Sequence, residues 1–231
     1  MMRVTSNTFS NSLVDQLDKL SARQNRWQHQ AVTGQRVETP ADDPVSMRRA
    51  LGLQATGTAL ARYQENASAV NDRANAEYEA TRGLKNISDR VRELATMADS
   101  TKPQEDLNDY RTELSALIQQ AVQLANQKYN GVYLFGGTRG DQPPFVATTD
   151  NFGRVTGVTY QGNENVAEVE VSEGQTVVSQ TLGANTGGAG ARGLITDTRS
   201  GADFFKHMIA LQDHLGAGDT EAIALEDNAN L

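Results

Sequence analysis

The fold is decided by residues 84–124, LKNISDRVRELATMADSTKPQEDLNDYRTELSALIQQAVQL. Its apolar residues recur at alternating steps of three and four, the spacing of a coiled-coil seam. The members before the break at residues 100–103 are Leu84, Ile87, Val91, Leu94 and Ala98, and those after it are Leu107, Tyr110, Leu114, Leu117, Ala121 and Leu124. The pattern predicts two helices that pair as an antiparallel hairpin, because a short connection returns the chain alongside itself.

The ends of these helices carry capping signals. Asp43 suits the N-cap of the first helix, and Pro44 suits its first helical position, where the missing N–H has no partner in any case. Thr101 and Gln104 have the spacing of a capping box for the second helix. That helix is expected to end at Asn130-Gly131, where a left-handed residue closes the last turn.

A third seam precedes the hairpin, in the first 33 residues. Its members are Leu13, Leu17, Leu20, Trp27 and Ala31, with Gln24 in register and Phe9 one step earlier. A lone helix cannot bury such a stripe, so the seam predicts an interface with a partner helix or with neighbouring molecules. An ordinary intramolecular core is the alternative.

Composition changes after Gly131, and strand-like segments separated by turn signals replace the helical pattern. The expected strands cover residues 132–135, 155–160, 166–171 and 175–182. A glycine-rich loop follows at 183–193, and then a helix over about 200–215 with an apolar face of Phe204, Met208, Leu211 and Leu215. Asp219 is expected to cap a last helix. The fold class is therefore mainly α with a β-rich insert: an elongated antiparallel helical bundle or coiled coil plus a small antiparallel β domain.

Charge and composition exclude several classes of protein. The net charge of −8 argues against general nucleic-acid binding, which needs a basic face. The absence of cysteine removes disulfides, thiolate catalysis and cysteine metal sites. No apolar run is long enough to cross a membrane, and the N-terminus lacks the apolar core of a secretory signal. Residues 1–36 carry a net +3 and residues 203–231 a net −5, so the two ends either attract each other or are ordinary solvated faces.

No catalytic constellation emerges. Residues 188–193, GAGARG, match the dinucleotide motif GxGxxG, but no helix follows directly, so a flexible loop among antiparallel strands is the better interpretation. His29, His207 and His214 are too scattered for a convincing metal site. Asp42 and Asp43 could be paired carboxylates, but their position before Pro44 favours helix capping.

Two motifs resemble one known family. Residues 32–37, VTGQRV, followed by PADDP at 40–44, are similar to the region near the N-terminus of flagellins and their junction relatives. Residues 130–138, NGVYLFGGT, followed by Pro144-Phe145, resemble the hook–filament junction branch, the third hook-associated proteins, rather than typical flagellins. The GADFF segment at 201–205 also suits that branch. The resemblance covers nearly the whole chain.

The resemblance implies a structural subunit of the bacterial flagellum at the junction between hook and filament, and not an enzyme, with no cofactor. Its terminal helix, residues 1–36, is expected to be disordered in the monomer and to pack in the inner tube through the seam from Phe9 to Ala31. The linker and helix start would comprise Gly34, Arg36, Asp42, Asp43 and Pro44. The hairpin over 37–131 would build the tube wall, 132–193 would form an outer β module, and 194–231 would return to the core.

The implied partners are further copies in a ring, the hook-side first hook-associated protein, flagellin, the flagellar export apparatus and an export chaperone. The implied location is extracellular, on the flagellum, after type III export. Members of the family carry a C-terminal helix near where Leu231 stands, so the printed chain is expected to polymerise poorly. The alternatives are a flagellin-type filament subunit, a nucleotide-binding enzyme that uses the glycine-rich loop, and a soluble coiled-coil signalling module.

Overall fold

The computed structural model describes residues 5–37 and 40–223, with the backbone alone for residues 5–9. The chain divides into two compact units, Met1–Leu60 and Ala61–Leu231. The first unit contains α1 (Thr5–Thr33) and the beginning of α2 (Pro44–Met97). Both helices were expected from the sequence, and α2 begins at the predicted residue.

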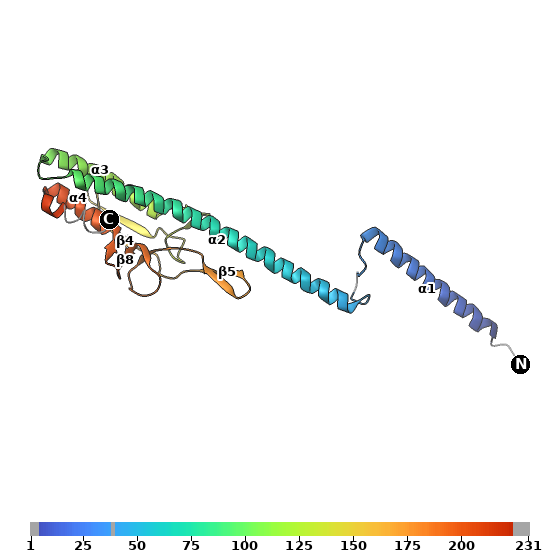
Figure 1. Cartoon of the computed structure of the whole chain (residues 1–231). Helices are drawn as coiled ribbons and strands as arrows, with labels where there is room; N and C mark the ends of the chain where they lie inside the picture. Colours follow the sequence, from blue (N-terminus) through green and yellow to red (C-terminus); the bar gives the residue numbers. More distant parts are fainter. Residues whose placement is uncertain (1–4, 38–39, 224–231) are drawn as a thin grey trace. The chain divides into compact units, whose positions relative to one another are not determined.

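The second unit is built on a helical hairpin, as predicted. It holds the rest of α2, then α3 (Gln104–Ala125) and α4 (Phe204–Ala217), with the strands beside them (Figure 1). The α2–α3 pairing is antiparallel, because Arg90 Nε lies 2.7 Å from Glu113 Oε1 while Gly83 lies against the side chain of Leu124. The predicted fold class is confirmed.

The seam of the hairpin forms the core of this unit. The four predicted α2 positions and Ala98, which follows the helix, are buried, and so are Leu107, Leu114 and Ala121 of α3. Tyr110, Leu117 and Leu124 are only partly buried. Ile118 and Ala125, which the sequence analysis left out, are fully buried, because α3 packs against α4 as well as α2 and therefore buries a wider face.

The end of α3 was predicted wrongly. The helix stops at Ala125, and Asn130 (φ 49°) and Gly131 (φ 81°) form the turn between β1 (Lys128–Tyr129) and β2 (Val132–Tyr133). Two successive residues with positive φ make a two-residue hairpin turn that Asn-Gly favours. The side chain of Asn126, just past the helix, exchanges two hydrogen bonds with the backbone of Phe145, at 2.6 and 2.9 Å.

The predicted capping box of α3 is also wrong. Pro103 is the N-cap residue and provides no side-chain hydrogen bond. Gln104 Nε2 instead donates to Leu215 O at the end of α4, at 3.1 Å. A long-range partner therefore displaces the local one that the spacing suggested.

The strands form small, separate sheets. In the described part of the chain β1 pairs with β2, β3 (Phe145–Thr149) with β4 (Val155–Tyr160), and β5 (Glu168–Ser172) with β6 (Gln175–Val178), all antiparallel. A three-stranded sheet has the order β7 (Leu182–Asn185), β8 (Gly193–Asp197), β9 (Ala202–Asp203). The β7–β8 pair is parallel, which corrects the expectation of purely antiparallel strands.

Helix α4 closes the core of the second unit. Asp203 caps it by accepting a hydrogen bond from Lys206 N at 3.1 Å, and Gly218 (φ 71°) ends it. The predicted core positions Met208, Leu211 and Leu215 are buried, but Phe205 replaces the predicted Phe204, with its ring centroid 5.5 Å from that of Phe145. Asp219 accepts from Ala222 N at 3.0 Å, as its predicted capping role requires.

The segment after β2 is fixed by burial. Leu134 and Phe135 are fully buried, and the Tyr160 hydroxyl lies 3.1 Å from the Phe135 carbonyl oxygen, to which it donates. Burial raises the pKa of Tyr160 to about 12, so this hydroxyl stays protonated and able to donate.

A buried ion pair ties α2 to two distant loops. Arg73 Nε lies 3.0 Å from Glu77 Oε1, and the two side chains are only 17% and 9% exposed. The other Glu77 oxygen accepts from Thr181 N at 3.1 Å, while Arg73 Nη2 donates to Leu134 O at 2.9 Å. Each charge is thus compensated by its partner and by a backbone group.

Replacement of Glu77 tests this pair. Glu77→Ala leaves Arg73 as an uncompensated charge and Thr181 N without an acceptor, so we expect a loss of about 3–5 kcal/mol in the free energy of unfolding. Glu79→Ala, at an exposed position of the same helix, should change it by less than about 0.5 kcal/mol. Urea denaturation of both variants measures the difference, and equal small effects would contradict the proposed importance of the pair.

Candidate assembly surface

The apolar stripe of α1 faces solvent. Leu13, Leu17, Leu20 and Trp27 are 49%, 57%, 64% and 63% exposed, and Ala31 is exposed as well. The side chain of Phe9 lies outside the described residues. A 29-residue helix that leaves one apolar face uncovered has the form of an interface helix rather than of a core helix.

The sequence analysis missed other exposed apolar residues of the first unit. Val14 and Val32 of α1 are 55% and 87% exposed. In the first turns of α2, the exposed large apolar residues are Val45, Leu51, Leu53 and Leu60. They do not follow one heptad register, so periodicity alone gave no signal for them.

The linker after α1 is held by local hydrogen bonds. Gly34 adopts a left-handed conformation (φ 69°), and its N–H donates to Gln30 O at 2.9 Å, which closes the last turn of the helix. Gln30 Nε2 donates to Arg36 O at 3.0 Å. Gly34, which the sequence predicted as part of the linker, thus forms the turn that ends α1.

The two neighbouring aspartates have different roles. Asp42 Oδ1 forms an ion pair with Arg26 of α1, at 3.0 Å. Asp43 caps α2: its Oδ1 accepts from Val45 N at 3.2 Å and from Ser46 N at 3.0 Å, and its Oδ2 accepts from the Ser46 hydroxyl at 2.6 Å. The second aspartate is the cap that the sequence predicted, with Pro44 at the first helical position.

Arg36 also contacts the Asp43 cap. Its Nη2 lies 3.5 Å from Asp43 Oδ2 and 3.4 Å from the Ser46 hydroxyl. The hydrogen bonds from Ser46, and to a smaller extent the charge of Arg36, lower the pKa of the Asp43 carboxyl below its usual value. Asp43 is therefore ionised, and able to cap α2, throughout the neutral range.

Replacing Asp43 should loosen the start of α2. In Asp43→Ala the Val45 and Ser46 amides lose their acceptor, so their hydrogen exchange should become faster, whereas Asp43→Asn keeps an acceptor oxygen and should retain most of the protection. Because the folded-state pKa of Asp43 is lowered, the protection that its cap gives to the start of α2 should persist at neutral pH. That protection should disappear only as the pH falls through the lowered pKa. Hydrogen exchange of residues 45–50 measures both effects, with Asp72→Asn, at an exposed position of the same helix far from its start, as the control.

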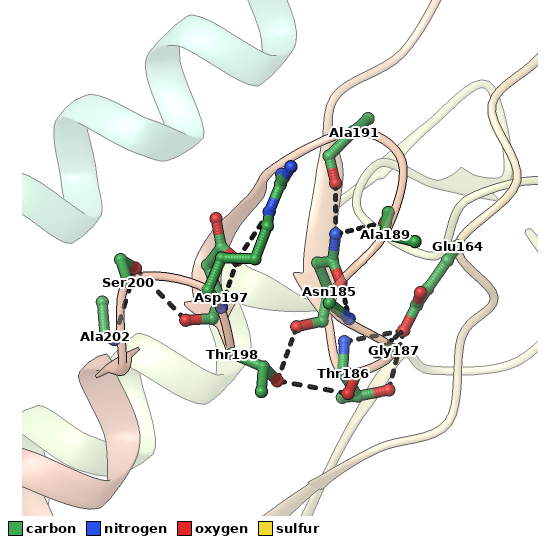
Figure 2. Close-up of polar contacts among 12 residues, drawn as sticks. Glu164, Asn185, Thr186, Gly187, Ala189, Ala191, Asp197, Thr198, Ser200 and Ala202 are labelled. Carbon is green, nitrogen blue, oxygen red and sulfur yellow. Dashed lines mark hydrogen bonds and ion pairs between the residues drawn. The ribbon is translucent and has the colours of Figure 1, made fainter.

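Side-chain hydrogen bonds bridge the glycine-rich loop at residues 183–193. Figure 2 shows Asn185, fully buried, with its side chain turned into the loop, where Nδ2 donates to Ala189 O (2.7 Å) and Ala191 O (2.6 Å) and Oδ1 accepts from Gly188 N (2.8 Å). Glu164 Oε1 accepts from Thr186 N, at 2.6 Å, from the Thr186 hydroxyl and from Gly187 N. Backbone donors that would hold a phosphate are thus used by the chain's own side chains.

The surroundings of this loop differ from those of a dinucleotide site. Residues 188–193 join two strands, β7 and β8, and not a strand to a helix.

His29 lies in α1, whereas His207 and His214 lie in α4. Within the described residues no group of three or more His, Asp or Glu side chains is placed to hold a metal ion. In residues 5–37 and 40–223, no helix combines the length and the apolar character that crossing a membrane requires.

Glu164 is predicted to help hold the loop closed. Its hydrogen bonds from Thr186 and Gly187 lower the pKa of the carboxyl below its usual value, so the loop should stay closed at neutral pH and open as the pH falls through that lowered value. Glu164→Ala should speed hydrogen exchange across residues 186–192 at neutral pH. Glu173→Ala, at an exposed position, should leave that exchange unchanged, and equal rates in both variants would exclude this role.

Comparison with known proteins identifies the family. The profile of the bacterial flagellin N-terminal helical region matches residues 4–139, which is more than half of the chain. This chain belongs to that family. The matched region includes α1, the linker, the α2–α3 hairpin and the segment through Gly137, so the exposed seam and the buried hairpin are parts of one flagellin-type helical region.

The chain is also similar to named flagellar proteins. It is 22% identical to flagellar hook-associated protein 3 of Salmonella typhimurium over 214 residues, 92% of this chain and 65% of that protein. The structure of a putative flagellar hook-associated protein from Vibrio parahaemolyticus matches with a TM-score of 0.63 at 20% identity, covering 82% of each chain. The FlgL structure from Bacillus cereus matches with a TM-score of 0.58 at 18% identity, covering 79% of this chain and 80% of that one. Both structures support the fold.

Proposed function

We propose that this flagellin-family chain is a structural subunit of the bacterial flagellum at the junction between hook and filament. The observation that carries the proposal is the uncovered apolar face of α1 within a chain that resembles hook-associated protein 3 along 92% of its length. An apolar stripe exposed over several turns has no role in a lone molecule and a clear one in an assembly, where neighbouring helices cover it.

Assembly would couple packing to ordering. The α1 helix buries no described large apolar residue, so it gains stability only when neighbouring subunits cover the stripe. Burial of each Leu or Trp side chain then offsets part of the ordering entropy of the helix. The cluster of Arg26, Asp42, Arg36 and Asp43 would set the start of α2 during this step.

The partners follow from this role. Further copies of the chain would stand beside it in a ring, with the first hook-associated protein on the hook side and flagellin on the filament side. The chain would reach the outside of the cell by flagellar type III export, with or without an export chaperone. The helical hairpin would form the tube wall, with the β-rich region outward, and the chain would have no enzymatic role.

Gene deletion in the host tests the function. Loss of the gene should leave hooks without filaments and release flagellin into the medium. The intact gene should restore filaments, whereas a version that lacks residues 1–36 should not. Electron microscopy of the cells and immunoblots of the medium give the readout. Normal filaments in a strain with no second copy of the gene would contradict the junction role, and labelling along the whole filament would indicate a flagellin instead.

Polar substitutions on the α1 stripe test its part in assembly. The triple change Leu13→Ser, Leu17→Ser and Leu20→Ser should abolish filament formation but alter the unfolding free energy of the purified protein by less than about 0.5 kcal/mol for each residue, because the side chains are exposed. Val32→Ser, which changes an 87% exposed residue of the same helix outside the predicted seam, is the matched control and should leave filaments intact. A large loss of stability in the triple variant would show that the stripe is an intramolecular core.

A further inference from the structure

Asn130 is the only asparagine of the chain that a glycine follows. Both residues are exposed at the turn between β1 and β2. Gly131 carries no side chain, and a Cβ atom added to it would meet nothing within 4 Å. The backbone nitrogen of Gly131 is therefore uncrowded, on a part of the turn that water reaches.

No partner among the described residues restrains the two groups. The Asn130 side chain forms no hydrogen bond there, and Gly131 N donates none. By contrast, the side chains of Asn126, Asn163 and Asn185 each bond to backbone groups of neighbouring segments. Rotation of the Asn130 amide toward the backbone nitrogen that follows it therefore breaks no side-chain contact.

The hairpin that holds this turn is short. β1 and β2 contribute two residues each, and a two-stranded pair of this length opens locally at a small free energy. Asn130 has a positive φ of 49°, which non-glycine residues seldom adopt. Local opening gives Asn130 the backbone freedom that a cyclisation needs, without unfolding of the core.

We propose that Asn130 is a site of spontaneous deamidation. The Gly131 nitrogen loses its proton to solvent and attacks Cγ of the Asn130 side chain. The amide nitrogen takes up a proton and leaves as ammonia, so that a cyclic succinimide joins the two residues. Water then opens the ring at one of its two carbonyl groups. The net change consumes one water, releases one ammonia and replaces an amide by a carboxylate, with no oxidation or reduction.

The two products differ in the backbone of the turn. Opening of the ring at the former side-chain carbonyl gives aspartate, which fits, because Asp-Gly favours the same two-residue turn as Asn-Gly. Opening at the main-chain carbonyl gives isoaspartate, in which the chain runs through the former side chain and gains a methylene group. A two-residue turn in the β1–β2 register has no room for this group.

Isoaspartate at residue 130 would also weaken the core next to the hairpin. Leu134 N donates to Gln127 O at 3.0 Å, one step beyond the paired residues of β1 and β2. Leu134 is fully buried, so a shift of register at the turn is transmitted to the packing of the second unit. This chemistry does not depend on the proposed assembly role.

Ageing of the purified protein tests the site. At mildly alkaline pH, mass spectrometry of the tryptic peptide of residues 129–139 should show conversion of Asn130 to acid at least tenfold faster than at Asn151. Asn151 is also exposed in a turn, but a phenylalanine follows it. The rate should rise with pH, because the attacking nitrogen must lose its proton. Equal rates at the two asparagines would overturn the proposal.

Asn130→Gly is the matched control, because Gly-Gly also favours the two-residue turn but has no side-chain amide. Aged wild-type protein should be labelled at residue 130 by isoaspartyl methyltransferase and should melt at a lower temperature than fresh protein. Aged Asn130→Gly should show no such label and should melt as it did when fresh. Label of equal strength in the variant would overturn the site.

Asn130→Asp separates the charge from the change in the backbone. Freshly purified Asn130→Asp carries the new carboxylate without the extra methylene group, so it should melt like fresh wild-type protein. If it melts as low as aged wild-type protein, the charge and not isoaspartate weakens the turn. Wild-type protein that is labelled yet melts unchanged would contradict the loss of register.

Discussion

Covering one face of α2 is the constraint on which the second unit depends. From Ala80 to Ala98 this face is apolar, and α3, α4 and the buried aromatic residues cover it. Toward its N-terminal end the same face becomes polar, so other groups cover it: Arg73 and Glu77 bind loop backbone, and Asn66 Nδ2 donates to Glu170 O of the β5–β6 hairpin at 2.8 Å. The small sheets are therefore attached to the helix partly through hydrogen bonds and ion pairs.

The polar contacts also explain why short strands keep a defined arrangement. Two-stranded sheets are marginal alone, and β5–β6 buries no residue fully. Side chains such as Asn126, Glu164 and Asn185 satisfy backbone groups of neighbouring segments and so replace the missing sheet hydrogen bonds. Figure 2 shows the densest of these networks, in which a loop rich in glycine is ordered by an internal carboxylate and a buried amide.

The candidate assembly surface differs from the core in how far its apolar side chains are buried. The stripe on α1 has the same periodicity as the α2–α3 seam, but its large side chains are 49–64% exposed, whereas Val91, Leu94 and Leu114 are fully buried. In the proposed assembly, neighbouring molecules would bury the stripe, whereas burial of the seam is complete in the monomer.

The sequence by itself determined the helices and their pairing, because a 3.5-residue repeat and the caps at Asp43 and Asp219 are local signals that no distant contact overrides. It also placed β4 at its observed residues, and it predicts a partner for the α1 stripe. Only the tertiary structure decided that Asn130-Gly131 turns a hairpin, that Gln104 bonds to the end of α4 and that Phe205 rather than Phe204 is buried. It alone paired β7 with β8 in parallel and tied Arg73 and Glu77 to the backbone of two distant loops. The Asn130-Gly131 turn is a local signal that was interpreted as a helix end. The other features depend on groups far apart in the chain, whose meeting no local pattern encodes.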